Sequence, residues 1–245
     1  MYHFFVEQEQ IEEQGIRILG SDVNHIRNVL RMKPGEEILI SSREGGDYHC
    51  SIESLDEDEV YADIMWKEEL GRELACQMIL FQGLPKGDKM EMIIQKNVEL
   101  GVHAIVPVAM KRCVVKLDAK KAQAKQKRWQ QISESAAKQS KRGIIPEITD
   151  VMSFKEALAY AEALDVKLLP YECAEGMPRT KKLLAAIEPG QKVGIFIGPE
   201  GGFEDKEVED AQNAGFEVMT LGRRILRTET AGMMLMSVLS YLLEE

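Results

Sequence analysis

The chain has 245 residues, of which 44% are hydrophobic and 29% are charged, the balance of an ordinary globular protein. No run approaches the roughly 18 apolar residues of a membrane helix, and the N-terminus lacks the basic and apolar regions of a signal peptide, so we expect a cytoplasmic protein that contacts no membrane. The net charge of −10 disfavours a protein that coats nucleic acid without specificity.

The charge is spread unevenly along the chain. Residues 1–70 carry 6 basic and 17 acidic side chains, whereas residues 111–145 carry 11 basic and 2 acidic ones. A basic block in an acidic protein is typical of a surface that meets a polyanion such as RNA. A solvated helix face would explain the same charges equally well.

The first 70 residues predict a small β-rich domain. Short alternating runs at Glu37–Ile40 and Val60–Ile64 are separated by glycine-containing turns. One helix is expected between residues 21 and 31, with Ser21 or Asp22 as its N-cap. Its apolar face would be formed by Val23, Ile26, Val29 and Leu30.

After residue 70 the pattern changes to apolar runs that alternate with helices, which predicts an α/β domain with a parallel sheet. The boundary is expected at Gly71 to Glu73, giving domains 1–70 and 71–245. The expected strands are Ala75–Phe81, Ala104–Ala109, Val166–Leu169, Val193–Ile197 and Glu217–Leu221. The expected helices span about 89–100, 118–141, 154–164, 205–214 and 228–243.

Two of these helices carry further signals. Asp88 and Glu91 form a capping-box pattern at the start of the first, and Gly101 stands where a left-handed residue ends a helix. The last helix is apolar on nearly every side over Ala231–Leu243, so it must be buried in a core or against a partner.

Metal and disulfide sites are not expected. The histidines lack ligand spacing, and the cysteines include no C-x-x-C pair, so we expect no bound metal and reduced thiols throughout. The four cysteines are Cys50, Cys76, Cys113 and Cys173. Signatures of dinucleotide enzymes, P-loop NTPases, zinc proteases and α/β-hydrolases are also absent.

Two glycine-containing loops follow predicted strands in the last third of the chain. Gly198–Phe203 follows one strand, and Gly222–Arg227, with three arginines, follows the next. Ligands of open α/β sheets bind beyond the carboxyl ends of strands, where glycines allow close backbone approach. A plain strand-to-helix connection would explain the first loop as well.

Five segments in this order resemble one known family. They are Lys86–Glu91 with Gln95–Val102, Arg128–Arg142, Pro146–Ile148, Ile197–Phe203 and Leu221–Ala231. Over nearly its whole length the chain is similar to the RsmE family of the SPOUT superfamily. That family uses S-adenosylmethionine to methylate N3 of a uridine in helix 44 of 16S ribosomal RNA.

The resemblance implies a fold and partners. It implies an N-terminal PUA-like β-barrel that contacts RNA, and a SPOUT methyltransferase domain in which helices flank a parallel sheet. The chain of that domain would pass through a trefoil knot, with the cofactor site at about residues 166–232. The implied partners are 16S rRNA or the small ribosomal subunit, and a second copy of the chain in a homodimer.

The resemblance also implies site residues. The cofactor would be enclosed by Leu168, Leu169, Gly198, Pro199, Glu200, Gly201, Leu221, Gly222, Ile225, Leu226 and Arg227. Arg227 would stabilise the uridine anion, and Glu229 or Glu200 could accept the N3 proton if its surroundings raise its pKa. Glu229 could equally serve only to interact with the helix dipole. RNA contacts would come from His25, Arg27, Arg31, Arg112, Arg128 and Arg142.

Three positions depart from the family pattern. His3 replaces a usual arginine and Asn24 replaces the first of two histidines, which we expect to weaken RNA contacts. Glu204 stands where Ser or Thr usually caps a helix, at an expected cost of about 1 kcal/mol.

Two other functions stay open on the sequence alone. A non-catalytic RNA-binding protein of ribosome assembly would keep the basic segment without binding a cofactor. A related SPOUT methyltransferase would act on another RNA position. The intact glycine loops favour an enzyme.

Overall fold

A computed structural model describes residues 1–42, 46–68, 73–172 and 176–244. The chain divides into two compact units. Unit 1 comprises Met1–Glu73 and Ala137–Ile145, and unit 2 comprises Leu74–Ala136 and Pro146–Glu245. The expected boundary falls mostly on residues outside the described ones, and the segment 137–145, which we expected in the second domain, packs with unit 1.

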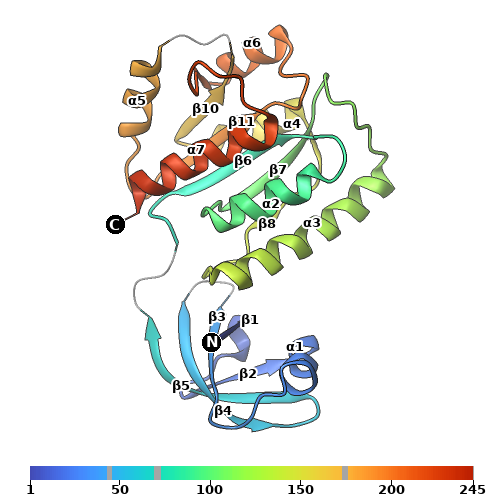
Figure 1. The fold of residues 1–245 in the computed structure, drawn as a ribbon, viewed down its shortest axis with the longest axis vertical. Helices are drawn as coiled ribbons and strands as arrows, with labels where there is room; N and C mark the ends of the chain where they lie inside the picture. Colours follow the sequence, from blue (N-terminus) through green and yellow to red (C-terminus); the bar gives the residue numbers. More distant parts are fainter. Residues whose placement is uncertain (43–45, 69–72, 173–175, 245) are drawn as a thin grey trace. The chain divides into compact units, whose positions relative to one another are not determined.

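Unit 1 is built on one curled five-stranded sheet with the order β1-β3-β4-β5-β2 (Figure 1). The strands are β1 (Tyr2–Val6), β2 (Gly15–Leu19), β3 (Glu37–Ser42), β4 (Asp47–Leu55) and β5 (Glu59–Glu68). β1 pairs in parallel with β3, and the other pairs are antiparallel. Ile16, Ile38, Ile40 and Ile52 are buried in its own apolar core. The prediction of a small β-rich domain is confirmed.

The helix of unit 1 differs from the expected one. α1 (Ser21–Asn24) continues directly into a π-helix, η2 (His25–Val29), in which the N–H of Leu30 donates to the carbonyl of His25 at 2.8 Å. Gly20, rather than Ser21 or Asp22, occupies the N-cap position. The wider π turn rotates Val29 out of the apolar face, and its side chain is 60% exposed. The expectation that Val29 packs inward was therefore wrong.

Unit 2 is built on a parallel sheet with the order β12-β10-β11-β6-β7-β8, and β9 also pairs with β7. The strands are β6 (Gln77–Gly83), β7 (Ala104–Ala109), β8 (Glu147–Ile148), β9 (Met152–Ser153), β10 (Val166–Pro170), β11 (Lys192–Ile197) and β12 (Glu217–Met219). Phe81 and Phe196 are fully buried on neighbouring strands, with ring centroids 5.3 Å apart.

Helices cover both faces of this sheet, with α2, α3 and α7 in front and α4 behind (Figure 1). They are α2 (Lys89–Glu99), α3 (Ala119–Ser140), α4 (Phe154–Tyr160), which continues into the 3-10 helix η3 (Ala161–Ala163), α5 (Met177–Ala185), α6 (Asp205–Asn213) and α7 (Thr228–Leu243). The α/β architecture with a parallel sheet flanked by helices is confirmed. α5 was not foreseen.

The ends of two helices partly follow expectation. Gly101, at φ +92°, ends α2 in a Schellman motif, and its N–H donates a hydrogen bond to the Val98 carbonyl. Asp88 occupies the N-cap position, but its side chain makes no capping hydrogen bond. The side chain of Glu91 pairs with Arg128. The expected capping box is therefore absent. Glu204 does form a capping box with α6, which offsets the penalty expected of it.

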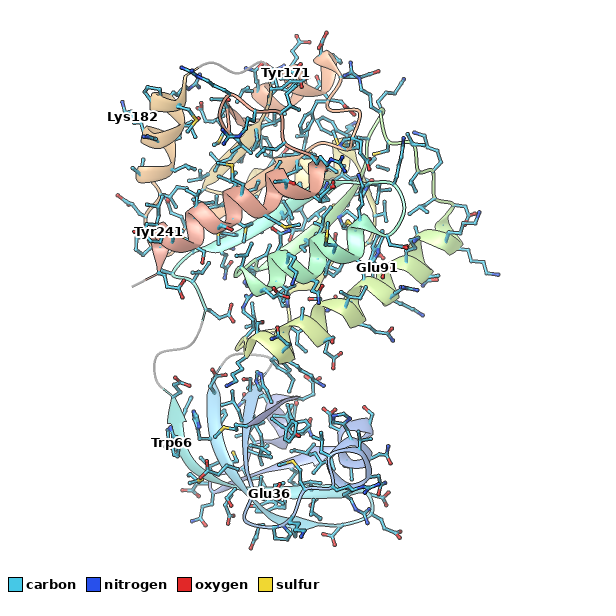
Figure 2. All side chains as sticks on the ribbon, in the orientation of Figure 1. Glu36, Trp66, Glu91, Tyr171, Lys182 and Tyr241 are labelled. Carbon is cyan, nitrogen blue, oxygen red and sulfur yellow. The ribbon has the colours of Figure 1, made fainter. Side chains whose placement is uncertain are left out.

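α7 is covered on one face only. Leu235, Met236 and Leu239 are buried, whereas Tyr241 is 84% and Leu242 is 50% exposed. Tyr241 projects from the C-terminal end of α7 (Figure 2). Full burial within this chain, one of the two outcomes expected for this helix, is therefore ruled out for the described residues.

Three of the four cysteines lie within the described residues. Cys50, Cys76 and Cys113 are buried and free, and burial raises the pKa of Cys50 to about 12. Cys173 lies outside the described residues. No cluster of three metal-ligating side chains occurs in the described part of the chain, and none of its helices is long and apolar enough to cross a membrane.

Candidate active site

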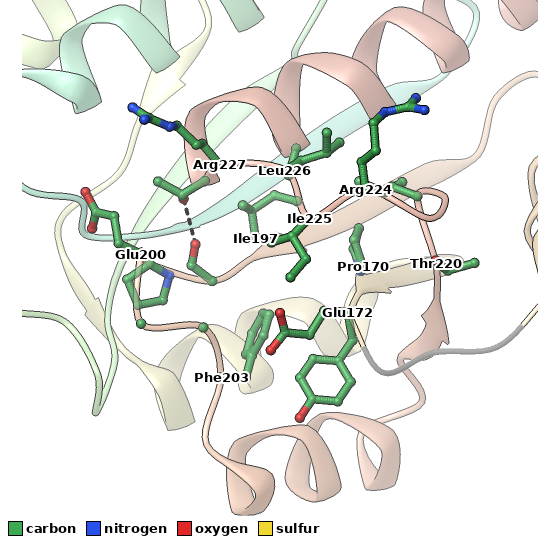
Figure 3. A pocket seen from close by; sticks show the side chains of 18 of the residues that line it. Pro170, Glu172, Ile197, Glu200, Phe203, Thr220, Arg224, Ile225, Leu226 and Arg227 are labelled. Carbon is green, nitrogen blue, oxygen red and sulfur yellow. Dashed lines mark hydrogen bonds between the residues drawn. The ribbon is translucent and has the colours of Figure 1, made fainter.

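A pocket of about 510 Å³ lies beyond the carboxyl ends of β10, β11 and β12 in unit 2. Its walls are the strand ends, the turn after β11 and the loop that joins β12 to α7 (Figure 3). Glu172 and Ile225 face each other across it in this view. The position is the one that open α/β sheets use for ligands, and the volume suits a nucleoside-sized molecule.

Most predicted cofactor residues line this pocket. They are Gly198, Pro199, Glu200, Gly201, Leu221, Gly222, Ile225, Leu226 and Arg227. Leu168 and Leu169 do not, because both are fully buried inside the sheet on β10. The chain reaches the pocket only after them, at Pro170, Tyr171 and Glu172.

The turn after β11 depends on glycine where the backbone packs tightly. A Cβ atom at Gly201 would lie 3.0 Å from Cβ and 3.1 Å from the carbonyl oxygen of Arg112. Gly202 has φ +67°, in the left-handed region. Arg112 also donates a hydrogen bond to the Gly201 carbonyl at 3.2 Å. The backbone thus fixes this wall of the pocket.

The loop after β12 is held by hydroxyl groups. The N–H of Gly222 donates to Thr220 Oγ1 at 3.2 Å, and Gly222 has φ +117°. From α5, the buried Thr180 hydroxyl donates to the Thr220 carbonyl at 2.8 Å. α5 therefore supports the loop that forms the second wall.

Three charged side chains meet at the rim where α2 begins. Lys89 Nζ lies 2.9 Å from Glu200 Oε1 and 3.4 Å from Glu229 Oε2. The N–H of Lys86 also donates to Glu200 at 3.1 Å. Two predicted catalytic carboxylates are thus brought together, and a lysine that we did not predict joins them.

The electrostatics of this cluster distinguish the two carboxylates. Burial alone would raise the pKa of Glu200, but the hydrogen bonds from Lys89 and from backbone N–H groups outweigh it and lower the pKa. The hydrogen bond to Glu200 raises the pKa of Lys89. Glu200 therefore does not meet the condition set for a base. Glu229 Oε2 is buried, and Lys89 Nζ at 3.4 Å is its charged neighbour.

Arg227 is the N-cap residue of α7 and lines the pocket. Its side chain is exposed and extends from the start of the helix on the same side as Glu200 (Figure 3). No salt bridge to Arg227 is found among the described residues, so its guanidinium is available to an anionic ligand.

The six predicted RNA contacts divide between the units. His25, Arg27 and Arg31 lie on and just after the π-helix of unit 1, with His25 and Arg31 exposed. Arg112 and Arg128 are exposed in unit 2. Arg128 on α3 pairs with Glu91 of α2 at 2.8 Å.

Arg142 does not suit the predicted role. Its side chain is 5% exposed, and Nε lies 2.9 Å from Glu73 Oε1 within unit 1. The same carboxylate accepts from the N–H groups of Gly143 and Ile144. This arginine is committed to holding the chain, so we withdraw it from the RNA surface.

Sequence reasoning missed several pocket residues. They are Lys89, Pro170, Tyr171, Glu172, Phe203, Thr220 and Ala231. Lys89 lay within the quoted motif Lys86–Glu91 and at the expected start of the helix 89–100, so its position was a usable signal. No sequence signal identified Tyr171 and Glu172, because they follow their strand without a recognisable turn motif.

Comparisons with known proteins agree over both units. A family model described as an RNA methyltransferase domain matches residues 72–240, and one described as an RNA methyltransferase PUA domain matches residues 18–65. The fold and pocket thus define an RNA methyltransferase with an N-terminal PUA domain.

Full-length relatives narrow this class. Ribosomal RNA small subunit methyltransferase E of Bacillus subtilis is 39% identical over 98% of this chain and 96% of its own length. The protein of that name from Mesomycoplasma hyopneumoniae is 35% identical over 97% and 98%. A Neisseria gonorrhoeae structure of that name, bound to S-adenosyl methionine, superposes with TM-score 0.83 at 32% identity, covering 99% of this chain and 98% of that one. The chain belongs to the ribosomal RNA small subunit methyltransferase E family.

Proposed function

We propose that this protein transfers a methyl group from S-adenosylmethionine to N3 of a uridine in helix 44 of 16S ribosomal RNA. The observation that carries the proposal is the pocket between two glycine-containing loops, which Arg227 and Lys89 line, with Glu229 Oε2 at 3.4 Å from Lys89 Nζ. Relatives that share this architecture along their whole length support it. An rRNA substrate implies a cytoplasmic location.

The residues of the pocket fit the cofactor. Open space lies beside Gly202 and Gly222, where an added Cβ would meet no atom within 4 Å, so a ligand can approach the backbone closely. The apolar side chains of Ile197, Ile225 and Leu226 line the same space. We propose that the backbone of both loops holds the adenine while these side chains flank it. The bound cofactor would supply an electrophilic methyl group.

The chain's own residues handle the uridine. N3 becomes a good nucleophile only after it loses its proton, so anion stabilisation lowers the barrier. We assign that task to the exposed guanidinium of Arg227, which cannot itself act as a base. We assign the proton to Glu229, whose carboxylate lies beside Lys89 at the start of α7. Glu200 and Lys89 then hold Glu229 and the start of α2 in place.

The RNA contacts that we propose are five of the six predicted residues, considered in each unit separately. His25, Arg27 and Arg31 belong to unit 1, and Arg112 and Arg128 belong to unit 2. The basic side chains of α3 between Lys120 and Arg128 add to the positive charge of unit 2. Phosphate contacts of this kind position an RNA without reading its sequence.

We also propose a homodimer and a trefoil-knotted chain at about residues 166–232. The half-covered face of α7, with Tyr241 and Leu242 exposed, supports a partner at that helix. A non-catalytic RNA-binding protein is the rival function, and the pocket between the two glycine-containing loops disfavours it.

Methylation of purified small ribosomal subunits tests the proposed function. Radiolabelled S-adenosylmethionine should label 16S rRNA, and nucleotide analysis should identify 3-methyluridine. A deletion strain should lack that nucleotide and regain it when the gene is restored. Binding of S-adenosylhomocysteine without any RNA methylation would favour the rival, and label at another base would favour a different RNA position.

A further inference from the structure

Gln82 is a fully buried amide in the middle of the unit 2 sheet. It lies near the carboxyl end of β6, opposite Ile197 on β11 and Pro107 on β7. A buried amide costs free energy unless its polar atoms are hydrogen bonded. Neither the pocket walls nor the proposed chemistry explains why a polar side chain occupies this position.

The amide starts a chain of hydrogen bonds toward the pocket. Gln82 Nε2 donates to the Gly83 carbonyl at 2.9 Å and to Thr228 Oγ1 at 2.8 Å. The Thr228 hydroxyl donates in turn to the Gly198 carbonyl at 2.6 Å, the bond drawn dashed in Figure 3. Both amide hydrogens and the hydroxyl hydrogen are used in these bonds, whereas no partner for the buried Gln82 Oε1 is found among the described residues.

These bonds join three parts of the site. Gly198 opens the glycine turn, and Thr228 is the first residue of α7, directly after Arg227. The Arg227 carbonyl accepts from the N–H groups of Thr230 and Ala231, each at 2.9 Å. Whatever holds Thr228 therefore also holds Arg227 relative to the turn that forms the opposite wall.

We propose that Gln82 and Thr228 are positioning residues that align Arg227 with the cofactor turn. This inference rests on the proposed methyl transfer. Alignment of reacting groups is a large part of such catalysis, and misplacement by about 1 Å can lower a rate about 100-fold. Simple packing is the competing explanation, since Thr228 is only 6% exposed.

A pair of variants separates alignment from packing. Thr228→Val keeps the shape of the side chain and removes the hydroxyl, whereas Thr228→Ser keeps the hydroxyl. Thr149→Val is the matched control, because Thr149 is 7% exposed and its hydroxyl donates at 3.0 Å to the Asp150 carbonyl, away from the pocket residues. Each variant is measured for kcat on small subunits, S-adenosylhomocysteine affinity and thermal unfolding.

We expect Thr228→Val to lose about tenfold or more in kcat and Thr228→Ser to recover most of it, with cofactor affinity changed by less than about threefold. Thr149→Val should lower the unfolding temperature without lowering kcat. A Thr228→Val enzyme with the kcat of the control would overturn the proposal. So would a loss confined to cofactor affinity, since the hydroxyl would then only shape the pocket.

A second variant and a second readout keep the test independent of turnover. Gln82→Met removes the first donor at similar volume, and combined with Thr228→Val it should add little further loss, because both break one chain. Hydrogen exchange at the Thr230 and Ala231 N–H groups should be faster in either variant and unchanged in Thr149→Val. Unchanged exchange overturns the positioning role, whereas a wild-type protein that methylates nothing overturns the proposed function and leaves the exchange result valid.

Discussion

Arg142 and Glu73 form a nearly buried ion pair inside unit 1, 69 residues apart in the sequence. The same carboxylate accepts from two successive backbone N–H groups, so it closes the turn that follows α3. A buried arginine deprived of its partner, or a partner deprived of its arginine, leaves an uncompensated charge.

Arg142→Met should therefore lower the stability of the protein rather than its RNA affinity. Breaking one side of a buried pair typically costs about 3–5 kcal/mol, and partial exposure of Glu73 puts this pair at the lower end. Chemical denaturation checks the free energy of unfolding. Unaltered stability together with weaker RNA binding would return Arg142 to the RNA surface.

Arg128→Glu tests the basic block on α3. The change should weaken RNA binding and reduce the slope of log affinity against log salt by roughly one unit for each lost phosphate contact. Lys155→Glu, an exposed lysine on α4 with the same charge change, is the control. Equal effects of both variants would mean that only the net charge matters and that the basic block is a solvated face.

Gly201→Val and Gly222→Val should abolish binding of S-adenosylhomocysteine while the protein stays folded. The first side chain would collide with Arg112, and the second would need φ near +117°. Gly190→Val, also at a positive φ but outside the pocket, should cost stability without altering affinity. Calorimetry measures all three, and normal affinity in both pocket variants would refute the assigned site.

Arg227 should determine turnover. Arg227→Lys keeps a charge but loses the planar fork, and Arg227→Ala loses both, so kcat should fall from wild type to Lys to Ala. Loss of one such contact typically costs about 10²–10³ in rate. Higher pH should recover part of the rate of Arg227→Ala by forming the uridine anion without help. If these variants lost only cofactor affinity and kept kcat, Arg227 would only shape the pocket.

The pair between Lys89 and Glu200 predicts a pH-dependent stability. The pKa of Glu200 is lowered on folding, so its contribution is present above its ordinary value of 4.5 and is lost as the pH falls through the folded value. The pKa of Lys89 is raised, so its contribution is present below 10.5 and is lost as the pH rises through the folded value.

Lys89→Met should therefore be less stable than wild type between these limits and should approach it in acid. Thermal unfolding across the pH range measures the difference. Lys206→Met, which breaks two ion pairs between more exposed side chains, should show a smaller difference in stability. A difference that persists unchanged in strong acid would trace the effect to packing of the lysine stem.

Most of unit 2 was predictable because its strands are buried on both faces and read as apolar runs between glycines. Ala104–Ala109 was placed at its observed bounds for that reason. α5 was missed because it exposes most of its surface, with only Thr180 and Leu184 buried. β1 was missed because it gains its partners from β3, more than 30 residues away, and local patterns carry no such information.

The sequence predicted those parts of the site where the backbone geometry requires glycine. It predicted the other site residues less well. Gly201 and Gly222 identify their loops, whereas nothing local distinguishes Arg142, held by a distant carboxylate, from an exposed arginine of the same basic block. The π-helix was likewise out of reach, since its apolar spacing imitates an α-helix up to Val29. The knot stays a prediction.

The division of the chain has a consequence for exchanging parts between relatives. Because α3 begins among residues of unit 2 and the stretch 137–145 packs with unit 1, the N-terminal module is not one contiguous piece of sequence. A chimaera that replaces only residues 1–73 would set a foreign acceptor at position 73 against the native Arg142, Gly143 and Ile144. A working swap must therefore transplant both stretches together, and natural recombination at a single crossover faces the same barrier.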